Sequence, residues 1–168
     1  KAVVGGNSFG AYMALHLAAK YPIVGVFAIS VPYMLRFPFN TRIMVRIARL
    51  RRLWTKKFSV TERAEREAAY YYEHMHGNGL GIVHAGNRVL DRECSRITAP
   101  CFVAHASGDP LAGDKSVESI LRNVKSKITG SYVAQTRRHH LLYGSGAKNT
   151  EKKIVDFFDS AHVFNKSA

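Results

Sequence analysis

The sequence predicts an α/β domain with a parallel sheet of about four strands, and three observations support this. Strand character occurs at residues 2–5, 23–31, 100–105 and 131–135. Helical patterns lie between these stretches. The run IVGVFAISV at 23–31 is almost entirely apolar, which is typical of a strand buried on both faces under helices. A chain of 168 residues is long enough for one domain with a sizeable core.

The first stretch, residues 1–22, is the most informative. Its strand leads into Gly6-Asn7-Ser8-Phe9-Gly10, and an Ala/Leu-rich helix follows at once. A serine at the apex of a strand–turn–helix sits in a strained backbone conformation with its side chain exposed. Gly6 and Gly10 have no Cβ, so we expect the strand and the helix to approach closely at these two positions. The alternative is a glycine-rich turn that binds phosphate or carries no chemistry.

The C-terminal part repeats the alternation of strands and helices. The strand at 100–105 ends in a turn that contains Asp109, and a helix is expected at 116–125. The strand at 131–135 leads into a loop with His139 and His140. The last helix is expected at about 149–160, and its inward face would hold four residues: Ile154, Val155, Phe157 and Phe158.

Between these parts lies an insertion, residues 34–98, with no buried-strand pattern. Helices are expected at 41–58, from Ser59 to about His76, and at about 82–94. Ser59 and Glu62 have the spacing of a capping box, which predicts the start of the second helix. We therefore divide the chain into a core, residues 1–33 and 99–168, and an all-helical cap, residues 34–98.

The formal net charge of +13 is concentrated in the insertion, because ten of the 25 basic residues lie between Arg36 and Arg66. The basic segment 42–57 is either a solvated helix face or a surface for anionic lipid or an acidic partner. No nucleic-acid-binding motif is present. Cys94 and Cys101 lack metal-ligand spacing and fit a reducing compartment, so we expect a cytoplasmic protein.

His74-Met75-His76 has no carboxylate or thiol cluster beside it in the sequence, so we expect neither a metal nor another cofactor.

Three chemically useful residues follow the carboxyl ends of predicted strands: Ser8, Asp109 and His140. Those ends meet at one edge of a parallel sheet, so the three side chains are expected to converge there. Asp114 competes with Asp109, which is favoured because it directly follows the strand and Gly108. His139 competes with His140, which is favoured because two leucines follow it.

With these motifs the chain resembles the C-terminal part of an α/β-hydrolase of the carboxylesterase and monoacylglycerol-lipase-like group. The elbow at 6–10, the strand and acid at 99–109, and the histidine loop at 140–142 carry the resemblance. It implies the last four strands of the family's sheet and a cap at 34–98. It also implies Ser8 as nucleophile, His140 as base, Asp109 as its partner, and the Phe9 backbone N–H as oxyanion donor.

By the same resemblance, the sequence lacks the family's earlier strands and the loop that gives the second oxyanion N–H. A fragment, a second polypeptide that supplies the missing half, or pairing of two copies would each account for this. We expect a partial chain that self-associates through the open edge of its first strand. The expected function is a serine hydrolase acting on short or medium acyl esters or monoacylglycerols. The alternative is a catalytically weak hydrolase-like domain that serves binding or self-association.

Overall fold

The computed structural model describes residues 2–35, 47, 53–55, 74–76 and 78–164. Four strands form one sheet in the order β1-β2-β5-β6. Their bounds are Val3–Asn7, Gly25–Ile29, Cys101–Ala106 and Thr129–Ala134. Neighbouring strands are parallel throughout. The predicted α/β class and four-stranded parallel sheet are therefore confirmed.

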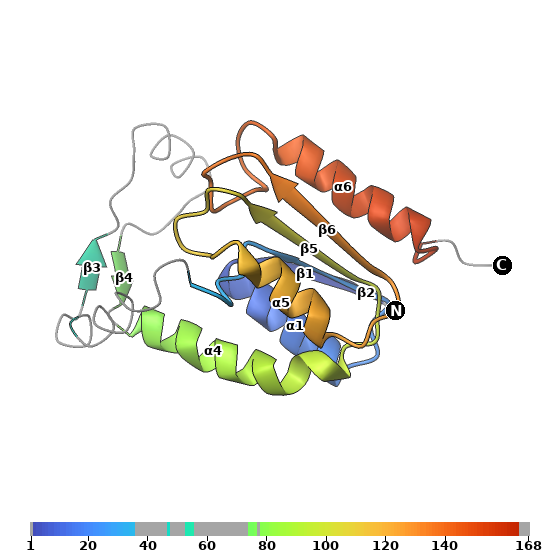
Figure 1. Cartoon of the computed structure of the whole chain (residues 1–168), viewed down its shortest axis with the longest axis horizontal. Coiled ribbons are helices and arrows are strands. Elements are labelled where there is room, and N and C mark those ends of the chain that lie inside the picture. The colour runs from blue at the N-terminus through green and yellow to red at the C-terminus, as the bar shows by residue number, and fades with distance from the viewer. Residues whose placement is uncertain (1, 36–46, 48–52, 56–73, 77, 165–168) are drawn as a thin grey trace.

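Helices cover both faces of this sheet (Figure 1). They are α1 (Phe9–Lys20), α4 (Gly79–Glu93), α5 (Lys115–Asn123) and α6 (Ala147–Ser160), with a short 3₁₀ turn at Cys94–Arg96. One apolar cluster joins α1, α4 and α5 to one face of the sheet, and a second joins α6 to the other face. The sheet is thus the central layer, and the loops lie at the ends of its strands.

The last helix, α6, contacts the sheet through a narrower stripe than expected. Ile154 and Phe158 are buried, one turn apart on the same face. Phe157 is half-buried against the same cluster. Val155 is 51% exposed, so its predicted inward position is wrong. It lies about 100° around the helix from Ile154, beyond the stripe that faces the sheet.

The insertion is not all-helical. Strands β3 (Leu53–Thr55) and β4 (His74–His76) pair antiparallel, so the helices expected at these positions are wrong. Trp54 and Thr55 are residue types that favour strands, although the apolar residues of this segment have helical spacing. Ile47 is helical, as expected, and the other residues of the two expected helices lie outside the described residues. Figure 1 places β3 and β4 beyond the carboxyl ends of the sheet strands.

The third expected helix of the insertion is present as α4, which begins three residues earlier than expected. Gly79 and Gly81 lie inside it rather than before it, because a helical glycine costs only about 1 kcal/mol relative to alanine. The division of the chain into a core and a cap at 34–98 stays a prediction.

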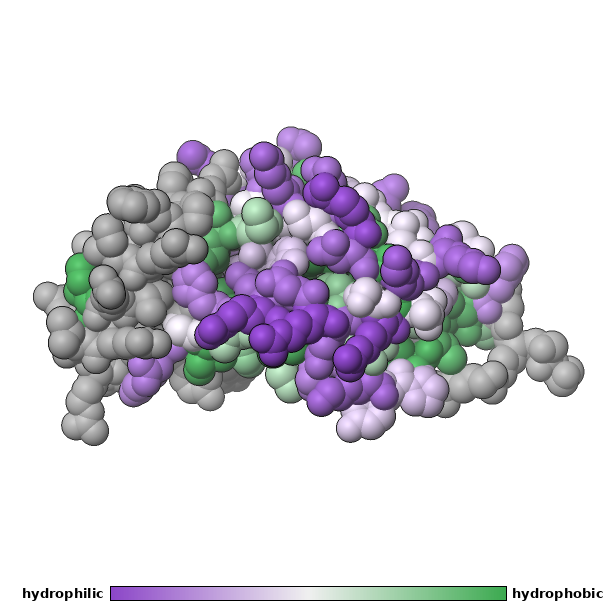
Figure 2. All heavy atoms as spheres, turned by 60° about the horizontal axis from the view of Figure 1, so that its bottom comes forward, coloured by the Kyte–Doolittle hydropathy of each residue, from purple (hydrophilic) through white to green (hydrophobic). Residues whose placement is uncertain are grey.

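Helix α4 is held against the core by polar contacts. His16 of α1 contacts Glu93 at 2.5 Å, and the Tyr12 hydroxyl donates to Asn87. The Tyr33 hydroxyl, after β2, donates to Asp91. Burial raises the pKa of Tyr12, which therefore stays a neutral donor. Hydrophilic side chains gather across the face that Figure 2 turns toward the viewer, where α4 lies.

None of the helices in the described ranges is long and apolar enough to span a bilayer.

Candidate active site

Ser8 lies at the sharp turn between β1 and α1 and has a strained backbone, with φ 55° and ψ −119°. A positive φ is costly for a residue with a Cβ, about 1–3 kcal/mol, and must be held by its surroundings. The Ser8 backbone N–H donates to the carbonyl of Ile29 at 2.8 Å, which fixes the turn to β2. The strained strand–turn–helix expected from the sequence is present at this position, and the role of Ser8 as nucleophile stays a prediction.

The two glycines of the elbow differ. A Cβ on Gly6 would lie 2.1 Å from the carbonyl oxygen of Gly10, so only glycine fits there. Among the described residues, a Cβ on Gly10 would meet no atom within 4 Å outside its chain neighbours and its own helix backbone. The close approach expected at Gly6 is confirmed, whereas the steric reason given for Gly10 is wrong. At the elbow, the backbone of Gly10 occupies the space that a Cβ on residue 6 would need. This requires glycine at position 6 but not at position 10.

A continuous hydrogen-bonded chain links Ser8, His139 and Asp109. His139 Nε2 lies 2.7 Å from Ser8 Oγ. His139 Nδ1 lies 2.8 Å and 3.0 Å from the two carboxylate oxygens of Asp109. A carboxylate accepts, so Nδ1 carries the ring proton and Nε2 is free to accept the Ser8 hydroxyl proton. The His139 side chain is 9% exposed and that of Asp109 is fully buried, so the contact between them is shielded from solvent.

Asp109 is fully buried in the loop after β5, yet it is held in the charged form. Burial, the largest single influence, would raise its pKa, but the interaction with His139 and two backbone hydrogen bonds together lower the pKa below its usual value. The backbone N–H groups of Leu111 and Ala112 donate these two bonds to Oδ1 at 2.8 Å and 3.0 Å. The loop thus presents an ionised carboxylate to the imidazole.

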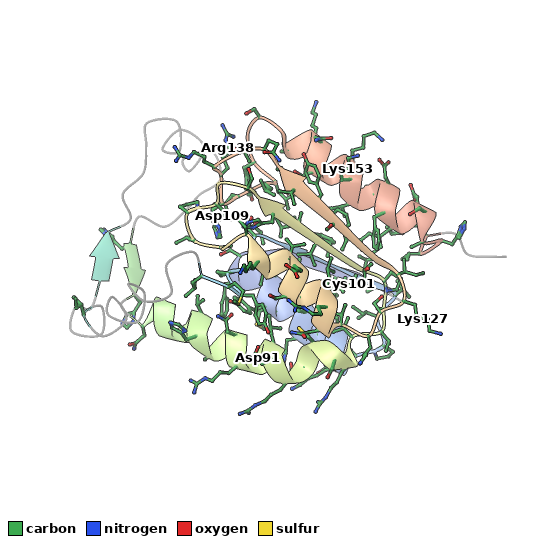
Figure 3. The ribbon with its side chains drawn as sticks, in the orientation of Figure 1. Asp91, Cys101, Asp109, Lys127, Arg138 and Lys153 are labelled. Atoms are coloured by element: carbon green, nitrogen blue, oxygen red, sulfur yellow. The ribbon has the colours of Figure 1, made fainter. Side chains whose placement is uncertain are left out.

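The three residues come from the ends of three strands, as the parallel topology requires. Ser8 follows β1, Asp109 follows β5, and His139 follows β6. Figure 3 shows Asp109 beside the loop that carries Arg138, the neighbour of His139, at the same edge of the sheet. The convergence at the carboxyl edge predicted from the sequence is therefore present.

His140 was the wrong choice of histidine in the sequence interpretation. Its Nδ1 accepts from the Asn7 side-chain amide at 2.7 Å, and it is His139 that lies between Ser8 and Asp109. The two leucines after His140 anchor the loop: Leu141 is buried and Leu142 is half-buried. The loop has no regular structure, so the leucines could not show which of two adjacent rings turns toward the serine.

The choice between the two acids agrees with the geometry. Asp114 is exposed, with its carboxylate 3.5 Å from the His105 ring, and the histidine at the serine contacts Asp109.

Phe9 is the first residue of α1, and its ring is 44% exposed. The first N–H groups of a helix lack intrahelical partners and carry the positive end of the helix dipole. The Phe9 N–H belongs to this end of α1, and its role as an oxyanion donor stays a prediction.

Sequence reasoning missed Asn7 as a residue of this site. Its position inside the elbow, next to the serine, was the available signal. His74 and His76 lie in β4, and within the described ranges no group of three or more potential ligands could hold a metal ion.

Comparison with solved structures shows similarity along almost the whole chain. A monoacylglycerol lipase from Paleococcus ferrophilus has a TM-score of 0.76 and 18% identity, over 95% of this chain and 68% of the lipase. A soluble variant of monoglyceride lipase from Saccharomyces cerevisiae has a TM-score of 0.71 and 14% identity, over 93% of this chain and 60% of the lipase. Mouse alpha/beta hydrolase domain-containing protein 10 has a TM-score of 0.65 and 14% identity, over 95% of this chain and 62% of the mouse protein.

No family model and no curated protein matches the sequence. The parallel sheet, the helices on both faces and the structural likenesses show that the chain has an α/β-hydrolase fold. It covers 60–68% of the length of these three structures, so it represents part of that fold.

Proposed function

We propose that the protein is a serine hydrolase that cleaves carboxylic esters through an acyl-enzyme. The hydrogen-bonded chain Ser8–His139–Asp109 is the observation that carries this proposal. Serine, acid and histidine occur in the chain order of α/β-hydrolases, which other triad folds do not share. The histidine role, expected at His140, passes to His139.

In the first step, Ser8 Oγ attacks the ester carbonyl carbon while His139 Nε2 takes the hydroxyl proton. The carbonyl oxygen becomes an oxyanion that the Phe9 N–H stabilises. The buried Asp109 carboxylate stabilises the imidazolium and keeps the ring oriented. Protonated His139 then gives its proton to the leaving alcohol oxygen as the carbon–oxygen bond breaks, which leaves an acyl group on Ser8.

In the second step, water attacks the acyl-Ser8 carbonyl and gives a proton to His139. The tetrahedral intermediate collapses to a carboxylic acid, and the proton returns to Ser8 Oγ. The chemistry needs no metal or organic cofactor. Monoacylglycerols and short or medium acyl esters are the proposed substrates, since two of the similar structures are named as monoacylglycerol and monoglyceride lipases.

The test is hydrolysis of p-nitrophenyl esters of increasing acyl length by the purified protein and by its Ser8→Ala variant. The wild-type protein is expected to release p-nitrophenol with a preference among acyl lengths, and Ser8→Ala to fall to the buffer rate. Equal rates for two folded proteins would contradict the proposal. No activity in folded wild-type protein would favour the alternative of a hydrolase-like binding module, to which the partial span of the fold also points.

A further inference from the structure

The elbow and the histidine loop are joined by two neighbouring side-chain contacts. Ser8 contacts His139 at 2.7 Å, and the preceding residue, Asn7, contacts the following residue, His140, also at 2.7 Å. Two consecutive residues of one segment therefore hold two consecutive residues of the other, although 131 or more positions separate them in the sequence. The rings of His139 and His140 pack edge to face, with centroids 5.0 Å apart.

The histidine loop is irregular and is held in part by side chains. Leu141 and Leu142 form a turn, and no helix or strand spans residues 137–143. The Arg138 N–H donates to Thr136 Oγ1 at 3.4 Å, which is long. Leu141 anchors the far side of the loop in the cluster under α6. Side-chain contacts therefore help to determine where the His139 ring sits.

We propose that Asn7 and His140 are positioning residues for His139. Their hydrogen bond fixes the loop against the elbow, so that His139 Nε2 stays within proton-transfer distance of Ser8 Oγ. This inference rests on the proposed function, because it assigns these residues a part in the same reaction. Neither residue touches the reacting atoms.

The chemistry of the contact suits this role. The Asn7 amide nitrogen is a donor, so His140 Nδ1 accepts and its Nε2 carries the proton of the neutral ring. Asn7 Oδ1 is buried and has no hydrogen-bond partner among the described residues. Turning the amide over would place this acceptor against a protonated Nδ1. The same pair can therefore hold the loop with either tautomer of His140.

The test measures the rate at which a fluorophosphonate labels Ser8 in wild type, Asn7→Ala, His140→Ala and the double variant. Each single variant is expected to label roughly 10- to 100-fold more slowly, the range expected when a catalytic group is displaced by about 1 Å. The double variant should be no slower than the singles, because both remove one shared contact. His140→Asn, whose side-chain oxygen can replace Nδ1 as acceptor, should recover most of the rate.

The matched control is Asn149→Ala, which removes a 2.7 Å amide hydrogen bond to the Tyr132 hydroxyl away from the elbow. It should label at the wild-type rate. Wild-type labelling in Asn7→Ala, additive losses in the double variant, or an equal loss in Asn149→Ala would each overturn the proposal.

A second readout does not depend on activity. The His139 Nδ1 proton, held by the buried Asp109 carboxylate, should give a downfield proton resonance in NMR. Asn7→Ala should shift or broaden this resonance, and Asn149→Ala should leave it unchanged. If wild-type protein does not label at all, the proposed function fails, and this resonance still decides the positioning role. A resonance identical in wild type and Asn7→Ala would overturn it.

Discussion

At the scale of single residues, the site contains two features that cost free energy: the strained backbone of Ser8 and the buried charge of Asp109. Hydrogen bonds from neighbouring groups compensate both. Ser8 has a positive φ, and its N–H is held by Ile29. Asp109 is charged and fully buried, and it accepts hydrogen bonds from His139, Leu111 and Ala112. Strained backbones and buried charges that are stabilised in this way cluster at functional sites of proteins.

The lowered pKa of Asp109 leads to a prediction about acid stability. Its folded-state pKa lies below the ordinary value of 3.8, so the unfolded state binds more protons as the pH falls toward and below 3.8. The stabilisation from Asp109 is therefore complete above pH 3.8 and is lost as the pH falls through the folded pKa. Urea denaturation between pH 6 and pH 3 should show a shallower loss of unfolding free energy for Asp109→Asn than for wild type. Equal slopes would contradict this.

At the same scale, the sequence was sufficient for the serine and the acid and insufficient for the histidine. Ser8 is identified by a turn that few residue types can form, and Asp109 by its place directly after a buried strand. His139 and His140 are adjacent, chemically identical and located in an irregular loop. Which ring faces Ser8 depends on Asn7, a contact from 133 positions away.

At the scale of elements, strands and helices with a clear apolar period were predictable. The spacing of apolar residues predicted the positions of α1, α5, α6 and all four strands of the sheet, within a few residues at their ends. Strands β3 and β4 were missed, because each has three residues and offers no period of its own. Val155 was misplaced because the stripe of α6 that faces the sheet is narrow.

The elbow glycines give a prediction at this scale. Gly6→Ala should destabilise the protein by several kcal/mol or prevent folding, because its Cβ would lie 2.1 Å from a backbone oxygen that cannot move without opening the turn. Gly10→Ala should be neutral or stabilising by up to about 1 kcal/mol, because there is open space and alanine favours helix. Thermal and urea unfolding of the two variants measures the difference. A Gly10→Ala loss as large as that of Gly6→Ala would contradict this account of the elbow.

At the scale of the whole molecule, the sheet brings together residues from its first, third and fourth strands in sequence. Within the described ranges, β1 pairs with β2 alone. Helix α1 exposes Phe9, Met13 and Leu17 at four-residue spacing, and its C-cap Tyr21 continues the row. Self-association through this edge stays a prediction, as do the lipid or acidic partner of segment 42–57 and the cytoplasmic location. The fold class was accessible from the order of elements, whereas the partners depend on surfaces that sequence periodicity does not describe.

The central claim is that the folded sheet assembles Ser8, His139 and Asp109 into a reactive serine. Fluorophosphonate labelling, with the modified residue located by mass spectrometry, tests it most directly in wild type, Ser8→Ala and His139→Ala. We predict modification of Ser8 in wild type, none in Ser8→Ala, and a rate lower by on the order of 10³-fold or more in His139→Ala. Folded wild-type protein that does not label at Ser8, or His139→Ala that labels at the wild-type rate, would contradict the account.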